Sequence, residues 1–198
     1  MALTKLNNKA VANVTSIPVA LGDMVFISSA TASSSASIEF SLGNYKEYKF
    51  FFVNMHPSVD GAEFQFNLST DSGSNYNVVK TSSAFNVMHG EDGNNGSLNY
   101  DANADLAQST ADQPISGSPR IGNGNDESAS GTLTLFNPSS TTYVKHFVSS
   151  FNCVFLLDRS INAFVGGYAN TTSPITNIRF KMLSGNIDAG KILMFGIN

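Results

Sequence analysis

The segment Ala62-Glu63-Phe64-Gln65-Phe66-Asn67-Leu68-Ser69 alternates apolar and polar side chains without a break. Successive side chains of an extended strand point to opposite faces, so the apolar residues share one face and the polar residues share the other. The pattern therefore predicts a strand over 62–69 that is buried on one face only. The two sets are Phe64, Phe66 and Leu68 on one side, and Glu63, Gln65 and Asn67 on the other.

Short segments of the same kind, bounded by turn-forming residues, recur along the chain. Residues 76–80 follow 62–69 after a compact turn, so we expect 62–80 to form a β-hairpin. About ten such strands predict an all-β fold, an antiparallel β-sandwich of jelly-roll type or a barrel. The other predicted strands are 24–28, 38–42, 46–54, 132–136, 142–149, 152–157, 161–168 and a last pair at 175–183 and 191–197.

The composition is consistent with a β-rich chain. Charged residues make up only 13% of the sequence, roughly half the usual share, so amphipathic helices would lack their solvated face. A length of 198 residues suits one domain. We therefore expect a single sandwich domain over 24–198, preceded by an extended N-terminal arm over 1–23.

The polar stretch 89–131 differs from the rest of the chain. Residues 89–99 and 116–131 are crowded with Gly, Asn, Asp and Ser, whereas Asn103 to Ser109 has the length for two turns of helix, capped by Asp101 or Asn103. We expect a long irregular loop that carries this short helix and projects between two strands. Loops of this length are usually functional, mobile or ordered by a partner.

The segment from Ser69 to Tyr76 resembles an Asp-box, a turn pattern found in sialidases and other β proteins. Asp71 would accept hydrogen bonds from nearby backbone amides, Gly73 would supply a positive φ, and Tyr76 would pack beneath the turn. The chain carries one copy, with Tyr in place of the usual Trp. We interpret it as a hairpin staple and not as a sign of glycosidase activity.

Oxygen-rich side chains gather at three places within 89–131. Calcium binds six to eight hard oxygen ligands, which loops of this kind can supply, but no segment has EF-hand spacing. The pattern favours solvated loops and leaves a calcium site open as an alternative. The three groups are Glu91, Asp92, Asn94 and Asn95; Asp101, Asn103 and Asp105; and Asn123, Asn125, Asp126 and Glu127.

Catalytic motifs are missing from the sequence. His56, His89 and His146 stand apart from one another, and the single cysteine, Cys153, lies in an apolar run that suits a buried strand residue. No nucleophile elbow, zinc-protease motif or phosphate-binding loop occurs. We therefore predict that the chain is not an enzyme, with no catalytic residues, no cofactor-binding residues and no metal ligands.

Charge and hydropathy narrow the range of partners. The chain has eleven Lys and Arg and fifteen Asp and Glu, which give a net charge of −4. The basic residues are scattered and form no stripe that could neutralise phosphates. This argues against nucleic acid and against an anionic membrane as partners. No apolar run suits a signal peptide or a membrane span, which predicts synthesis in a cytoplasm.

Several turns and strand ends in the C-terminal part resemble those of small virion structural proteins of marine tailed bacteriophages, such as cyanophages. These segments are 131–142, Gly166-Gly167-Tyr168, 178–190 and 195–197, and the similarity extends over most of 38–198. The opening Met1-Ala2-Leu3-Thr4-Lys5-Leu6 is also similar to the starts of phage tail and head appendage proteins.

The resemblance implies a non-enzymatic virion protein, either a capsid decoration (cement) protein or a head-appendage subunit. Such a protein would form a homo-oligomer and contact major capsid or tail subunits. We expect the arm 1–23 to dock to the particle or to a neighbouring subunit. The alternative is a tail fibre or a receptor-binding tip, with 89–131 as the surface that recognises a host glycan.

Overall fold

The computed structural model describes residues 23–118, 120–155 and 157–198, and its regular secondary structure is entirely β-strand. The predicted arm over 1–23 lies outside these ranges except for Asp23. The strands are β1 (Met24–Thr31), β2 (Ile38–Ser41), β3 (Glu47–Pro57), β4 (Phe64–Ser69), β5 (Lys80–Gly90), β6 (Ser97–Tyr100), β7 (Leu106–Ser109), β8 (Gln113–Pro114), β9 (Ala129–Phe136), β10 (Lys145–Phe155), β11 (Arg159–Ala169), β12 (Asn177–Met182) and β13 (Ile187–Ile197).

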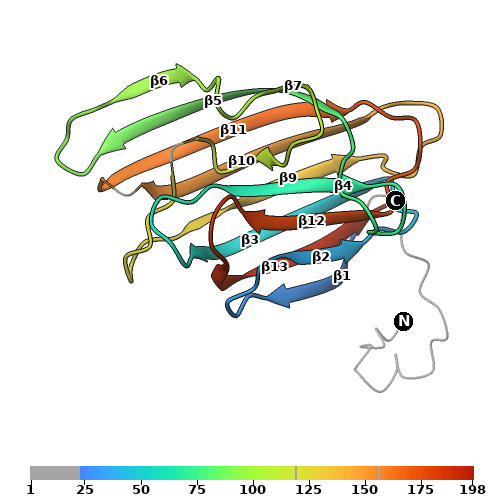
Figure 1. Cartoon of the computed structure of the whole chain (residues 1–198), viewed down its shortest axis with the longest axis horizontal. Helices are drawn as coiled ribbons and strands as arrows, with labels where there is room; N and C mark the ends of the chain where they lie inside the picture. Colours follow the sequence, from blue (N-terminus) through green and yellow to red (C-terminus); the bar gives the residue numbers. More distant parts are fainter. Residues whose placement is uncertain (1–22, 119, 156) are drawn as a thin grey trace, which may run out of the picture.

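The described strands form two antiparallel sheets that pack face to face (Figure 1). The large sheet has nine strands in the order β1-β13-β3-β9-β10-β11-β5-β6, with β7 also paired to β5. The small sheet has four strands in the order β2-β12-β4-β8. The predicted all-β antiparallel sandwich is confirmed, and its jelly-roll type stays a prediction.

Aromatic rings hold the two sheets together. Phe52 of β3 packs against Phe64 of β4 and Phe180 of β12, with ring centroids 5.2 and 5.1 Å apart. All three side chains are buried. Burying a Phe side chain contributes about 1.5–3 kcal/mol, and edge-to-face ring pairs add about 0.5–1.5 kcal/mol. The inward-facing residues of both sheets therefore form one core.

Gly131 of β9 leaves room for two of these rings. It lies directly between Phe52 of β3 and Phe151 of β10 in the strand register. The two rings meet at a centroid distance of 5.4 Å. A Cβ at Gly131 would lie 2.5 Å from the Phe151 ring and 2.5 Å from the Ser150 carbonyl oxygen. The missing side chain is thus a packing requirement.

The predicted hairpin over 62–80 is wrong. β4 pairs with β12 and β8 in the small sheet, whereas Lys80 begins β5 in the large sheet. The turn after Ser69 therefore carries the chain from one sheet to the other. The predicted last pair of strands is divided in the same way, because β12 lies in the small sheet and β13 in the large one.

The expectation that 62–69 is buried on one face only is also wrong. Every residue of β4 is buried, and Glu63, Gln65 and Asn67 are at most 9% exposed. The Asn67 amide donates to the Thr110 carbonyl oxygen at 3.0 Å, and Lys80 Nζ donates to Asn67 Oδ1 at 2.6 Å. Residues from outside the small sheet therefore cover the polar face of β4.

The predicted irregular loop 89–131 contains strands β6, β7 and β8 and overlaps the ends of β5 and β9. The short helix expected at Asn103–Ser109 is absent, and β7 occupies 106–109. One turn does form, with the Ala104 amide bonded to the Asp101 carbonyl oxygen at 3.1 Å. Two helical turns are unstable alone, whereas the edge of β5 offers backbone partners to β7.

The two strands predicted at 142–149 and 152–157 are one strand, β10. Its buried and exposed side chains alternate without interruption from Lys145 to Cys153. The small residues Ser149 and Ser150 fit this alternation, with Ser149 buried and Ser150 exposed. They continue the strand because a serine on either face of a sheet requires no turn.

Gly131→Ala should destabilise the protein by about 1–3 kcal/mol, because overpacking a close-packed core forces backbone or ring shifts. Gly166→Ala in β11, two strands away in the same sheet, is the matched control. A Cβ there would contact only the Phe147 carbonyl oxygen, at 3.9 Å. Urea unfolding of both variants measures the difference, and equal stabilities would contradict the packing role of Gly131.

Lys80 should make the free energy of unfolding vary with pH in the alkaline range. Burial lowers the pKa of this lysine to about 8 from its usual 10.5. Between these values the unfolded chain binds more protons than the folded chain, so stability rises with pH across this window, by up to about 3 kcal/mol. Lys80→Met should remove the rise. Urea unfolding between pH 8 and 10.5 measures the free energy of unfolding of the wild type and of Lys80→Met. The same dependence of that free energy on pH in both proteins would refute the burial effect.

Candidate functional site

The turn at Ser69–Tyr76 has the predicted Asp-box geometry. The Asp71 carboxylate accepts from the Ser69 hydroxyl at 2.6 Å and from the Asn75 backbone amide at 2.9 Å, and Gly73 has a φ of 85°. These hydrogen bonds, first that of Ser69, lower the pKa of Asp71 to about 2. The turn is therefore a structural staple, but it links the two sheets instead of closing a hairpin.

The carboxylates in the oxygen-rich groups of 89–131 accept hydrogen bonds from nearby residues of the same 89–131 segment. Asp92 accepts from the Asn94 amide at 2.9 Å, and Glu127 accepts from the Gly124 amide. Asp101 is 4% exposed and accepts from the Ser118 amide at 2.8 Å and from its hydroxyl. Within the described ranges, no three His, Cys, Asp or Glu side chains are placed to hold a metal ion.

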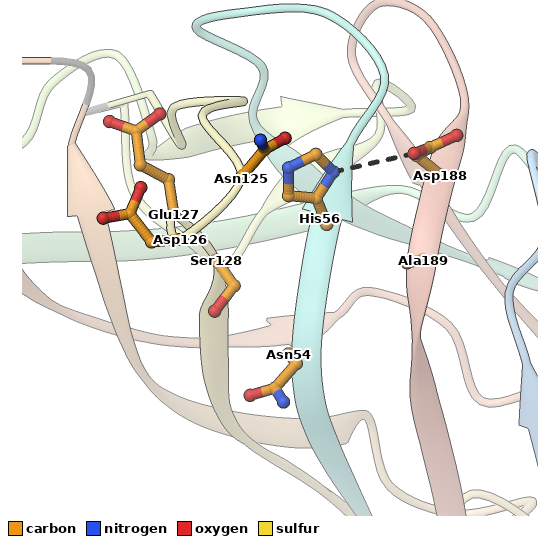
Figure 2. A pocket seen from close by; sticks show the side chains of 8 residues that line it. All are labelled: Asn54, His56, Asn125, Asp126, Glu127, Ser128, Asp188 and Ala189. Atoms are coloured by element: carbon orange, nitrogen blue, oxygen red, sulfur yellow. Dashed lines mark ion pairs between the residues drawn. The ribbon is translucent and has the colours of Figure 1, made fainter.

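His56 lies in a cavity of about 560 Å³ at the ends of β3 and β13 (Figure 2). Its Nδ1 is 3.8 Å from the Asp188 carboxylate, and its Nε2 is 3.2 Å from the Gly124 carbonyl oxygen. Figure 2 shows that the carboxylates of Asp126 and Glu127 point away from the ring. Because partners lie beside both ring nitrogens, His56 is placed to hold the 123–128 loop against β13.

The other predicted isolated residues lie apart from this cavity. Cys153 is buried, as predicted, and burial raises the pKa of its thiol to about 12. A thiol with so high a pKa forms little of the thiolate that acts as a nucleophile. His89 and His146 are exposed on β5 and β10.

The outer face of the large sheet, which points away from the small sheet, has an unusual composition on four consecutive strands, β9, β10, β11 and β5. The outward-pointing residues of β5, β9, β10 and β11 include no Asp, Glu, Lys or Arg. They are small polar residues interspersed with apolar ones. The most exposed apolar members are Phe85, Val87, Phe136 and Val148.

The outer face has a ridge beside a depression. Phe85 and Phe164 stack on neighbouring strands, with ring centroids 4.9 Å apart and an interplanar angle of 16°. Next to them lies an apolar hollow of about 310 Å³ whose lining includes Val148, Ser83 and Gly166. Gly166 lies at the hollow because it has no side chain to fill it. Gly166, from the Gly166-Gly167-Tyr168 segment, thus shapes this surface.

A second cavity, of about 620 Å³, lies between the inner face of the large sheet and the segment 99–118, together with Arg120. Asp101 anchors this segment to the sheet, because its backbone amide bonds the Ala84 carbonyl oxygen at 2.9 Å. The sequence analysis placed Asp101 and Asn103 of the lining in one oxygen-rich group. The lining residues are Asn86, Met88, Asn99, Tyr100, Asp101, Ala102, Asn103, Ser118, Arg120, Phe155, Arg159 and Ile161.

The sequence matches no protein-family model, and no curated protein is significantly similar to it. No helix in the described part of the chain is long and apolar enough to cross a membrane. A functional assignment therefore depends on the chemistry of the two surfaces described above, the outer face and the 620 Å³ cavity.

Asp101→Ala should destabilise the protein by about 2–3 kcal/mol, because several buried donors would lose their charged acceptor. Asp105→Ala is the control, since Asp105 accepts only from the exposed Tyr100 hydroxyl among the described contacts. Thermal unfolding of both variants tests this. If Asp101 were instead a calcium ligand, added calcium would raise the melting temperature of the wild type, and we expect no change.

Proposed function

We propose that the chain is a non-enzymatic structural subunit that associates with copies of itself through the outer face. We further propose that it serves in the virion of a tailed bacteriophage, as a capsid decoration protein or a head-appendage subunit. The resemblance to small phage virion proteins suggests the virion, and the part of the outer face over β5, β9, β10 and β11, which has no Asp, Glu, Lys or Arg, supports the self-association. The jelly-roll type of the sandwich belongs to the same proposal.

The absence of fixed charge on the outer face of β9, β10, β11 and β5 favours a second copy as the partner. The whole chain has a net charge of −4, so two copies repel each other through most orientations. Contact through β5, β9, β10 and β11 brings no like charges together on these strands. Interface cores are depleted in charged residues and enriched in aromatic ones, as this face is.

The relief of the outer face also suits contact between identical copies. A two-fold interface must be complementary to itself, so each protrusion must meet a hollow of the same patch. The stacked Phe85 and Phe164 rings form such a protrusion, and the hollow beside Gly166 lies directly next to it. Aromatic side chains that fill pockets are the usual energetic anchors of interfaces.

A receptor-binding or glycan-binding tip is the second candidate. The 620 Å³ cavity favours it, because the cavity is bordered by part of the polar 89–131 segment and lies within the usual size range of small-ligand sites, about 300–1,000 Å³. A phage tip module can both self-associate and bind a ligand, so the two candidates need separate tests.

Val148→Lys should abolish self-association of the full chain, because two copies would bury like charges at the centre of the interface. Leu183→Lys is the matched control, since the two side chains are 55% and 51% exposed and Leu183 lies outside the large sheet. Both changes reduce the net negative charge, so a loss confined to Val148→Lys cannot arise from general repulsion. Light scattering after size-exclusion chromatography measures the mass of each protein.

A wild-type chain that stays monomeric at high concentration would overturn the proposed self-association. A Val148→Lys variant as large as the wild type would overturn the proposed location of the interface. Circular dichroism of each variant checks that the β structure is retained.

A further inference from the structure

We propose that the 620 Å³ cavity binds a carboxylated sugar, such as a uronic acid residue of a surface polysaccharide. This inference goes beyond the assembly role and does not depend on it. It stands on three features of the lining: a buried acceptor without a donor, two arginines without ion pairs, and an apolar wall.

The buried acceptor is the side-chain oxygen of Asn86. Asn86 is 5% exposed, and its Nδ2 donates to Asp101 Oδ2 at 3.2 Å. Because a carboxylate can only accept, the amide nitrogen must face Asp101. The Oδ1 atom is then left without a hydrogen-bond partner. A buried acceptor without a donor costs about 1–3 kcal/mol, which a ligand hydroxyl group would recover.

The two arginines make the cavity attractive to an anion. The ion pairs among the described residues are His56–Asp188 and Arg179–Asp112, so neither Arg120 nor Arg159 makes a direct ion pair. Each interacts only through longer-range attraction with a carboxylate, Arg120 with Glu63 and Arg159 with Asp92. Arg159 lies over the Phe155 ring at 5.9 Å, which restrains its guanidinium group. Guanidinium groups bind carboxylates through two parallel hydrogen bonds.

Asp101, the acidic residue of the lining, does not compete for this anion site. Its carboxylate accepts from the amide and hydroxyl of Ser118, from the Asn103 amide at 3.3 Å and from Asn86. All of its acceptor capacity toward the protein is thus in use, and it serves to fix Asn86 and the 101–118 segment. The carboxylate of the ligand would therefore meet the arginines.

The rest of the lining suits a sugar better than a bare anion. Met88, Phe155 and Ile161 provide an apolar wall against which the C–H face of a pyranose can pack. Asn99 and Asn103 are exposed at the cavity and carry amides that can both donate and accept, as sugar hydroxyl groups require. A small anion such as phosphate would leave the apolar wall and Asn86 without contacts.

The test is to titrate the full-length protein with methyl glucuronide and with methyl galacturonide. Isothermal titration calorimetry and ligand-observed NMR detect the binding. We expect saturable binding of at least one uronide and at least tenfold weaker binding of the matching neutral methyl glycosides. Arg120→Gln should weaken uronide binding about tenfold through the loss of a charge-assisted hydrogen bond. Arg120 is exposed, and thermal unfolding checks that the variant keeps its fold.

Lys46→Gln is the control for the loss of one positive charge, since Lys46 is exposed and does not line the cavity. Asn86→Leu should also weaken binding, with thermal unfolding as a check on its fold. No uronide binding would overturn the proposal. So would equal affinity for acetate or inorganic phosphate, for a sulfated sugar, or for the neutral sugars. Val148→Lys should bind the uronide as the wild type does, which separates this test from that of self-association.

Discussion

A sheet of four strands packs against a sheet of nine, so the small sheet cannot cover the whole apolar inner face of the large one. The exposed remainder would carry a penalty of roughly 25 cal/mol for each Å² of apolar surface left in water. The chain covers it with residues that precede and follow β8, among them Ala104, Ile115 and Ile121, each 0% exposed. This largely polar stretch is therefore part of the core in the region of β5 and β11.

Covering a core with a polar segment requires that its buried polar groups find partners. Gln113 donates to the Ala104 carbonyl oxygen at 2.7 Å, and Lys80 donates to Asn67 and to the Val78 carbonyl oxygen at 2.8 Å. Such contacts offset the desolvation of each group. Where they are incomplete, as at Asn86 Oδ1, the structure carries an unsatisfied group beside a cavity.

Period-two alternation predicted most of the strands, because each inward side chain reaches a common core. It could not predict which strands pair. The Asp71 turn is a local structure that forms equally well in a hairpin or between sheets, so it does not specify where the next strand goes. Alternation also cannot show that Glu63, Gln65 and Asn67 are buried, since partners from other parts of the chain cover them, such as Thr110, which lies 43 positions from Asn67. The cavity was missed for the same reason, because its lining comes from separate segments between Asn86 and Ile161.

Strand β5 shows how one sheet can serve both proposed roles. Phe85 points outward to the ridge of the outer face, and the next residue, Asn86, points inward to the cavity. Strand β11 divides its residues in the same way, with Phe164 outward and Ile161 inward. If identical copies meet through their outer faces, their cavities lie on the sides facing away from the contact. Association would therefore leave every cavity open and would multiply weak sugar contacts on one particle, which is the arrangement that turns low single-site affinity into firm attachment.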